Sequence, residues 1–243
     1  MDLKEVDELS VRSERKHWWI KTRFLYIDKL FSFCRKEKVK VAEYGCGTGQ
    51  NLWYLKERSS QSKKVDLAIG IDPNLDNQFE AEWIDEKFKL SNDLNTFASN
   101  EADVVLAMDV LEHIDDQEEA LNHWVSTLNK DGQILITVPA FKSLWSYHDE
   151  FLDHKRRYTK KDLEIVARKC GLRPVYLSYA FGFLFPAVYI IRKLSKGSKD
   201  NQDLKLPNFI LNSLLFIFGK VEKMLGGNPF FGTSVIGIFE KNE

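Results

Sequence analysis

Short apolar runs alternate with amphipathic helical patterns over the first 140 residues, and this alternation restricts the chain to few folds. Apolar runs that suit buried strands lie at 39–44, 67–71, 103–107 and 134–138, with a weaker one around 88–90. Helical spacing separates them, at 24–36, 51–58 and 115–128. Because strands that alternate with helices usually pair in parallel, with helices on both faces, we predict a doubly wound α/β sheet. Such a sheet binds its ligand at the carboxyl ends of the strands.

Single residues predict where these elements begin and end. The first helix is expected to end near Lys36. Asp115 and Glu118 have the spacing of a capping box, which predicts the start of the next clear helix. Lys130-Asp131-Gly132 is expected to form the turn out of that helix, and Pro139 to end the strand that follows.

The second half of the chain adds elements to the same sheet. A helix is predicted at Thr159–Cys170, a strand at Pro174–Tyr179 and a last, antiparallel strand at Ser234–Glu240. Residues 180–232 form an apolar helical insertion before that strand, with the polar linker SKGSKDNQD and a helix at Phe209–Leu225. We treat 1–243 as a single domain in which 1–38 form an N-terminal helical cover.

Composition excludes several classes of protein. Thirty-five Lys and Arg against 36 Asp and Glu leave a net charge of −1, so a nucleic-acid partner is not expected. Cys34, Cys46 and Cys170 form no CxxC pair, which argues against a disulfide framework or a metal site and favours the cytoplasm. No secretory signal is evident, and the run Tyr179–Ile191 is shorter than the about 20 apolar residues that cross a bilayer.

A cluster of glycines follows the first predicted strand, in the segment Glu43-Tyr-Gly45-Cys-Gly47-Thr-Gly49. Bare backbone at a strand-to-helix turn lets a nucleotide-like ligand approach closely. A dinucleotide fingerprint would place its third glycine at position 50, which is Gln50, so a nicotinamide cofactor is disfavoured. Asp72 ends the second strand, where an acidic residue can accept both ribose hydroxyls.

These features resemble the class I S-adenosylmethionine-dependent methyltransferases, whose first motif is an acidic residue followed by GxGxG. Asp109-Val-Leu-Glu-His113-Ile resembles the VLEH motif of that superfamily, and LNKDGQILITVP resembles its segment around the fifth strand. The similarity spans roughly residues 39–175. It implies a Rossmann-like sheet and S-adenosylmethionine as the cofactor, with no metal required.

The resemblance also implies roles for individual residues. Glu43 would face the methionine amino group, Asp72 the ribose, Asp93 with Leu94 the adenine, and the Met108 carbonyl the methionine end. His113 has a structural alternative, as a residue that holds a helix start. The implied cofactor-binding positions are Trp18, Arg23, Glu43, Gly45, Cys46, Gly47, Gly49, Asp72, Pro73, Asp93, Leu94, Met108, Asp109 and His113.

Two segments are less generic than these motifs. In His17-Trp18-Trp19 the indoles would shield the sulfonium of the cofactor, and Arg23 would pair with the methionine carboxylate. The alternative is that this segment only packs in the hydrophobic core. FKSLWSYHDEFLDHKRRY, after the fifth strand, resembles a stretch of a bacterial methyltransferase group found near cell-envelope sugar genes. Its candidate catalytic bases are His148 and His154, and its candidate substrate-binding residues are Trp145, Arg157 and Tyr158.

We therefore predict a methyltransferase that acts at oxygen or nitrogen of a small-molecule or sugar- or lipid-linked acceptor. The alternative from another class is a catalytically silent member of the fold that serves as a binding or assembly module. The insertion 180–232 would be a substrate lid, a homodimer contact or a patch for peripheral contact with a membrane surface. In the last case the protein would work at the inner membrane surface.

Overall fold

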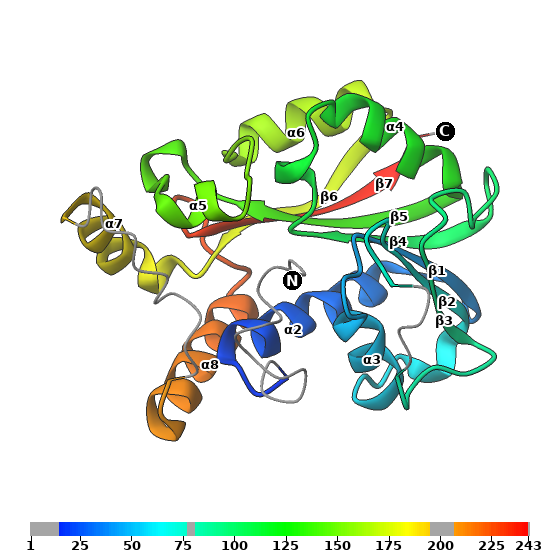
Figure 1. Cartoon of the computed structure of the whole chain (residues 1–243), viewed down its shortest axis with the longest axis horizontal. Coiled ribbons are helices and arrows are strands. Elements are labelled where there is room, and N and C mark those ends of the chain that lie inside the picture. Colours follow the sequence, from blue (N-terminus) through cyan, green and yellow to red (C-terminus); the bar gives the residue numbers. More distant parts are fainter. Residues whose placement is uncertain (1–14, 77–80, 195–206, 243) are drawn as a thin grey trace.

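The computed structural model describes residues 15–76, 81–194 and 207–242, and a seven-stranded sheet forms the centre of this part of the chain (Figure 1). Its strands are β1 Val39–Tyr44, β2 Val65–Ile71, β3 Phe88–Ser91, β4 Ala102–Met108, β5 Leu128–Pro139, β6 Leu172–Ala180 and β7 Ser234–Lys241. They lie in the order β3-β2-β1-β4-β5-β7-β6. The first five strands pair in parallel, whereas β7 runs antiparallel to both β5 and β6. The predicted doubly wound, Rossmann-like sheet with an antiparallel last strand is therefore confirmed.

Helices cover both faces of the sheet, and each face has its own apolar core. The helices are α2 Trp18–Phe33, α3 Gln50–Glu57, α4 Gln117–Thr127, α5 Tyr147–Phe151, α6 Lys160–Lys169, α7 Phe185–Leu194 and α8 Phe209–Met224. In Figure 1, α4 and α6 lie above the sheet, and α2, α3 and α8 lie below it. Strand β4 is buried along its whole length, because both layers pack against it. This explains its unbroken apolar sequence.

Several predicted boundaries differ from those in the structure. Helix α2 ends at Phe33 and not near Lys36. Helix α4 is capped by Asp116, whose side chain accepts from the amides of Glu118 and Glu119, so the capping box predicted at Asp115 is one residue early. The predicted turn at 130–132 lies inside β5 as an irregularity, because β5 pairs with β4 at Leu128 and again from Gln133.

The insertion forms two helices outside the sheet. Helix α8 packs on α2. The two helices can approach closely because residue 219 is a glycine, and a Cβ at Gly219 would lie only 2.7 Å from the Thr22 side chain. Helix α8 ends at Met224, one residue before the predicted end, and the predicted linker 195–203 lies outside the described residues. Within the described ranges, no helix combines the length and the apolar character that a membrane span requires.

Candidate active site

The glycine loop lies between the carboxyl ends of β1 and β4, where the strand order reverses. Gly45 has a φ of +66°, and a Cβ there would lie 2.4 Å from Val110 Cγ2 on the loop after β4. Gly49 has a φ of +73° and directly precedes α3. A side chain at either position would strain the backbone and collide with the residues packed against the loop, so both positions require glycine. In doubly wound sheets this reversal is where ligands bind.

Glu43 holds a buried carboxylate beneath this loop. Its Oε1 accepts a 2.6 Å hydrogen bond from Asn51 Nδ2, whereas its Oε2 is buried and has no hydrogen-bond partner among the described residues. Burial raises the pKa of Glu43 to about 7, against the lowering effects of Asn51 and the Arg23 guanidinium. Among the described residues, one oxygen of this carboxylate is therefore left without a donor.

Asp72 fixes the loop from the neighbouring strand. Its Oδ2 accepts from the Gly47 amide at 2.9 Å, and its Oδ1 accepts from the Asn74 amide at 3.0 Å. Pro73 beside it is exposed. Asp93 and Leu94, which follow β3 at the same edge of the sheet, are also exposed.

Arg23 reaches from α2 to the end of β4. Its Nη2 donates to the Met108 carbonyl at 3.0 Å and lies 3.1 Å from Asp109 Oδ2, and its guanidinium stacks on the Trp19 ring. Arg23 and Met108 are expected from the sequence to be separate contacts to the methionine end of the cofactor, but in the structure they are hydrogen-bonded to each other. The positive charge of Arg23 therefore lies at the carboxyl end of β4, among the groups predicted to hold the cofactor.

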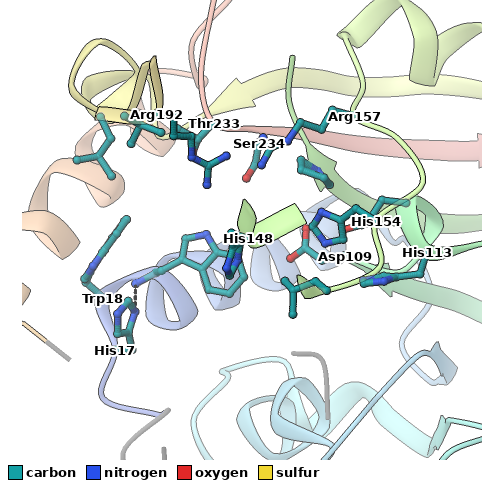
Figure 2. A pocket seen from close by; sticks show the side chains of 16 residues that line it. His17, Trp18, Asp109, His113, His148, His154, Arg157, Arg192, Thr233 and Ser234 are labelled. Atoms are coloured by element: carbon teal, nitrogen blue, oxygen red, sulfur yellow. Dashed lines mark hydrogen bonds between the residues drawn. The ribbon is translucent and has the colours of Figure 1, made fainter. Parts of the chain in front are cut away.

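A cavity of about 250 Å³ opens beside this edge of the sheet (Figure 2). It contains six of the predicted site residues, namely Trp18, Asp109, His113, His148, His154 and Arg157. Its other lining residues are His17, Trp19, Glu112, Pro139, Leu152, Leu184, Val188, Arg192, Thr233 and Ser234. Segments far apart in the sequence thus enclose one mixed polar and aromatic space, which suits a small organic molecule.

Asp149 organises the polar side of the cavity. It is fully buried, and its Oδ1 lies 2.9 Å from His154 Nδ1. Arg157 donates to both of its oxygens, from Nε at 2.7 Å and from Nη2 at 3.0 Å. Burial alone would raise the pKa of Asp149, but the His154 hydrogen bond and the Arg157 guanidinium outweigh it and hold that pKa well below its usual range. Because the Asp149 carboxylate is ionised and can only accept, His154 Nδ1 is the donor of this hydrogen bond, and Nε2 is the ring nitrogen that this bond does not use.

Two predicted substrate residues do not line this cavity. Tyr158 is buried, and its hydroxyl donates to Gln117 Oε1 at 2.9 Å. Trp145 is half-buried beside α5. His123 of α4 is half-buried and packs edge-on against Tyr44.

Several residues of the site were not predicted from the sequence. Asp149 lies in the segment FKSLWSYHDEFLDHKRRY, but nothing in its spacing indicates that it would hold His154. Glu112 is part of the VLEH-like motif and was read only as part of that motif. Arg192, Thr233 and Ser234 come from α7 and the start of β7, so only the tertiary fold brings them to the site.

Comparisons with known proteins agree with this architecture. The family model described as a methyltransferase domain matches residues 19–177, which is well over half of the chain. No curated protein matches the chain. Among solved structures, a SAM-dependent methyltransferase from Archaeoglobus fulgidus is 20% identical, with a TM-score of 0.58 and coverage of 98% of this chain and 97% of that one.

Two further structures share the fold at lower identity. A chain from the Haloferax volcanii complex between the Trm112 methyltransferase activator and a methyltransferase is 14% identical, with a TM-score of 0.59 and coverage of 100% and 99%. Phosphoethanolamine N-methyltransferase 2 of Haemonchus contortus, solved with S-adenosyl-L-methionine, is 14% identical, with a TM-score of 0.57 and coverage of 100% and 60%. From the match of the family model, the chain belongs to the methyltransferase domain family.

Proposed function

We propose that the protein transfers a methyl group from S-adenosylmethionine to oxygen or nitrogen of a small-molecule or sugar- or lipid-linked acceptor. One observation carries this proposal: Glu43 and Asp72 end adjacent parallel strands and flank a single glycine loop, next to a cavity that could hold an acceptor. That arrangement offers one carboxylate to the amino-acid end and one to the ribose of a nucleoside that carries an amino acid. It gives no comparable place for a second nucleotide, because Gln50 stands where a dinucleotide site needs glycine.

The residues at the sheet edge fit this cofactor. The unpartnered Glu43 Oε2 would accept from the ammonium of the methionine moiety, and Arg23 would face its carboxylate beside the Met108 carbonyl. Asp72 would accept from the ribose hydroxyls through the lone pairs that the Gly47 and Asn74 amides leave free. The remaining contacts would be backbone at Gly45, Cys46, Gly47 and Gly49, adenine contacts at Pro73, Asp93 and Leu94, and cover by Trp18.

The cavity residues would position the acceptor. The cofactor supplies a methyl group on a sulfonium, so the protein must chiefly align the acceptor atom, and alignment of this kind is worth about 7–11 kcal/mol. Arg157 is tied to Asp149, which makes it a fixed cation in the wall, and Trp145 and Tyr158 would support that wall from behind. A hydroxyl acceptor must also lose a proton, for which His148 and His154 line the same space.

The exposed apolar surface of α7 and α8 supports a role at a membrane surface. Ile210, Leu214, Ile217, Val221 and Met224 recur on one side of α8, and each is between 46% and 72% exposed. Lys220 and Lys223 on the same helix would favour anionic headgroups. A second copy of the chain is the other partner that such a surface would suit.

Transfer of labelled methyl groups tests the proposal. Purified protein is incubated with methyl-labelled S-adenosylmethionine and a cell-envelope extract, and products are identified by mass spectrometry. We expect label in a low-molecular-weight or lipid-linked product, and much less of it when the Asp72→Ala variant replaces the wild type at the same low cofactor concentration. A folded wild-type protein that binds S-adenosylmethionine but labels nothing would instead support the silent binding module.

A further inference from the structure

Three side chains that can bind metal ions meet at one wall of the cavity. Glu112 and His113 are adjacent on the short helix η3 Leu111–His113 after β4, and His154 follows α5. One candidate ligand atom from each residue lies within 4.8 Å of the others. All three residues line the cavity, and Figure 2 shows His113 and His154 side by side there. Their rings stand edge to face with centroids 4.7 Å apart.

Glu112 supplies the first independent sign of a missing partner. The residue is 1% exposed, and its Oε2 is buried with no hydrogen bond to any part of the chain that the structure describes. A buried oxygen without a hydrogen-bond partner loses its interaction with water and destabilises the folded protein, so such atoms are rare in proteins. A cation between Glu112 and the two imidazoles would remove that cost.

His154 supplies the second sign. Its Nδ1 hydrogen-bonds to Asp149, and this carboxylate is itself fixed by two hydrogen bonds from Arg157. Histidines that ligate metals usually donate their other ring N–H to a carboxylate or carbonyl, which orients the ring and fixes the tautomer. The Asp149–His154 pair has this form and leaves Nε2 as the ligand atom.

We propose that Glu112, His113 and His154 bind a divalent transition-metal ion, best matched by Zn²⁺, at the wall of the acceptor cavity. Two imidazoles and one carboxylate suit zinc, and three protein ligands leave a coordination position for another molecule. This site departs from the expectation that no metal is involved, which rested on the cysteine spacing and on the resemblance alone.

The site deepens the proposed function and rests on it for its chemical role. A hydroxyl of the acceptor that binds the open position loses its proton more readily, and the proton passes to His148 or to water, because His154 is then a metal ligand and no longer a base. The oxygen then forms a bond to the methyl carbon while the carbon–sulfur bond breaks and its electron pair stays on sulfur. The site therefore favours an acceptor that is methylated at oxygen.

Metal binding is measurable without any methyl transfer. Metal-stripped full-length protein is titrated with Zn²⁺ by calorimetry, and Co²⁺ is added separately to record visible absorption, which reports coordination by nitrogen and oxygen ligands. We expect one equivalent to bind. Glu112→Gln, which keeps the shape of the buried side chain, and His113→Ala should each weaken binding by more than about tenfold, a lower bound taken from the loss of outer-shell partners.

His148→Ala is the matched control, because His148 lines the same cavity but is outside the cluster. We expect it to keep wild-type metal affinity. The proposal is overturned if the wild type binds no ion, or if Glu112→Gln and His113→Ala bind as tightly as His148→Ala does. Because S-adenosylmethionine is absent from the titration, a protein that binds the cofactor but no metal refutes this site alone, and a protein that binds metal but no cofactor refutes only the proposed function.

Discussion

At the residue scale, the buried carboxylate of Glu43 makes both stability and cofactor binding depend on pH. Burial raises its pKa to about 7 from an ordinary value of 4.5, so the folded chain holds that proton more tightly than the unfolded chain does. The unfolding free energy should therefore fall as pH rises from about 4.5 toward about 7, and stay at its lower value above that. A cation bound at Glu43 Oε2 would stabilise the ionised carboxylate and lower its pKa.

Cofactor affinity should consequently depend on pH through Glu43. As pH falls from about 8 to about 6, Glu43 becomes protonated and its attraction for the ammonium of S-adenosylmethionine is lost, so affinity should decrease by up to about tenfold per pH unit. Calorimetric titrations at several pH values measure this. Glu43→Gln should bind weakly with a flatter profile, and an equal slope in the variant and the wild type would assign the proton to another group.

Asp72 carries the second test at this scale. Asp72→Ala should weaken S-adenosylmethionine binding by at least about tenfold, because each hydrogen bond to a charged group is worth about 1.5–3 kcal/mol. Asp66→Ala, an exposed position on the same strand, is the control and should bind normally. Both affinities come from one calorimetric series. An Asp72→Ala affinity within about twofold of the wild type contradicts the ribose assignment.

The residues of the glycine loop could be predicted from sequence, whereas the pairing of Asp149 with His154 could not. Gly45 and Asp72 lie at strand ends, and strand ends follow from the apolar pattern. Asp149 meets His154 because the short helix α5 turns back at Leu152 and Arg157 holds the carboxylate from the next segment. Contacts of that kind depend on packing and leave no periodic signal.

At the element scale, the position of α2 depends on α8. Gly219 of α8 lies against Thr22 of α2, one turn after the tryptophans that face the cavity. Gly219→Val should cost about 1–3 kcal/mol through overpacking and should also weaken cofactor binding, because Arg23 shifts with α2. Lys220→Val places the same side chain one residue on, at an exposed position, and serves as the control.

Thermal unfolding and calorimetry compare the two variants. A lower Tm for Gly219→Val than for Lys220→Val, together with weaker S-adenosylmethionine binding, is the expected result. Equal Tm and equal affinity would mean that α8 does not set the position of α2. The strands and α6 were predictable, but this helix contact was not, because a glycine in an apolar helix says nothing of its partner.

At the scale of the whole molecule, the exposed side of α8 should bind anionic bilayers. The wild type should float with vesicles that contain acidic lipids, and Ile217→Lys should reduce the floating fraction severalfold, since Ile217 is 54% exposed on that side. Ile165→Lys replaces a similarly exposed isoleucine on α6 and should float like the wild type. A wild type that stays in solution but sediments as a dimer would identify a second copy as the partner.

The doubly wound, mostly parallel sheet could be predicted from the sequence, because apolar runs alternate with helical patterns over the first 140 residues. The composition of the cavity did not follow, since its walls come from α2, the loop after β4, the α5 segment, α7 and β7. The distances between these segments are set only when both apolar cores are packed. Sequence could therefore locate the cofactor edge of the sheet more completely than the acceptor side.

S-adenosylmethionine should bind at the carboxyl ends of β1 and β2, and a calorimetric titration of the full-length protein with this cofactor tests this most directly. We expect saturable binding of one equivalent, with S-adenosylhomocysteine competing for the same site. A folded protein, verified by circular dichroism, that gives no saturable heat with either compound would contradict this assignment.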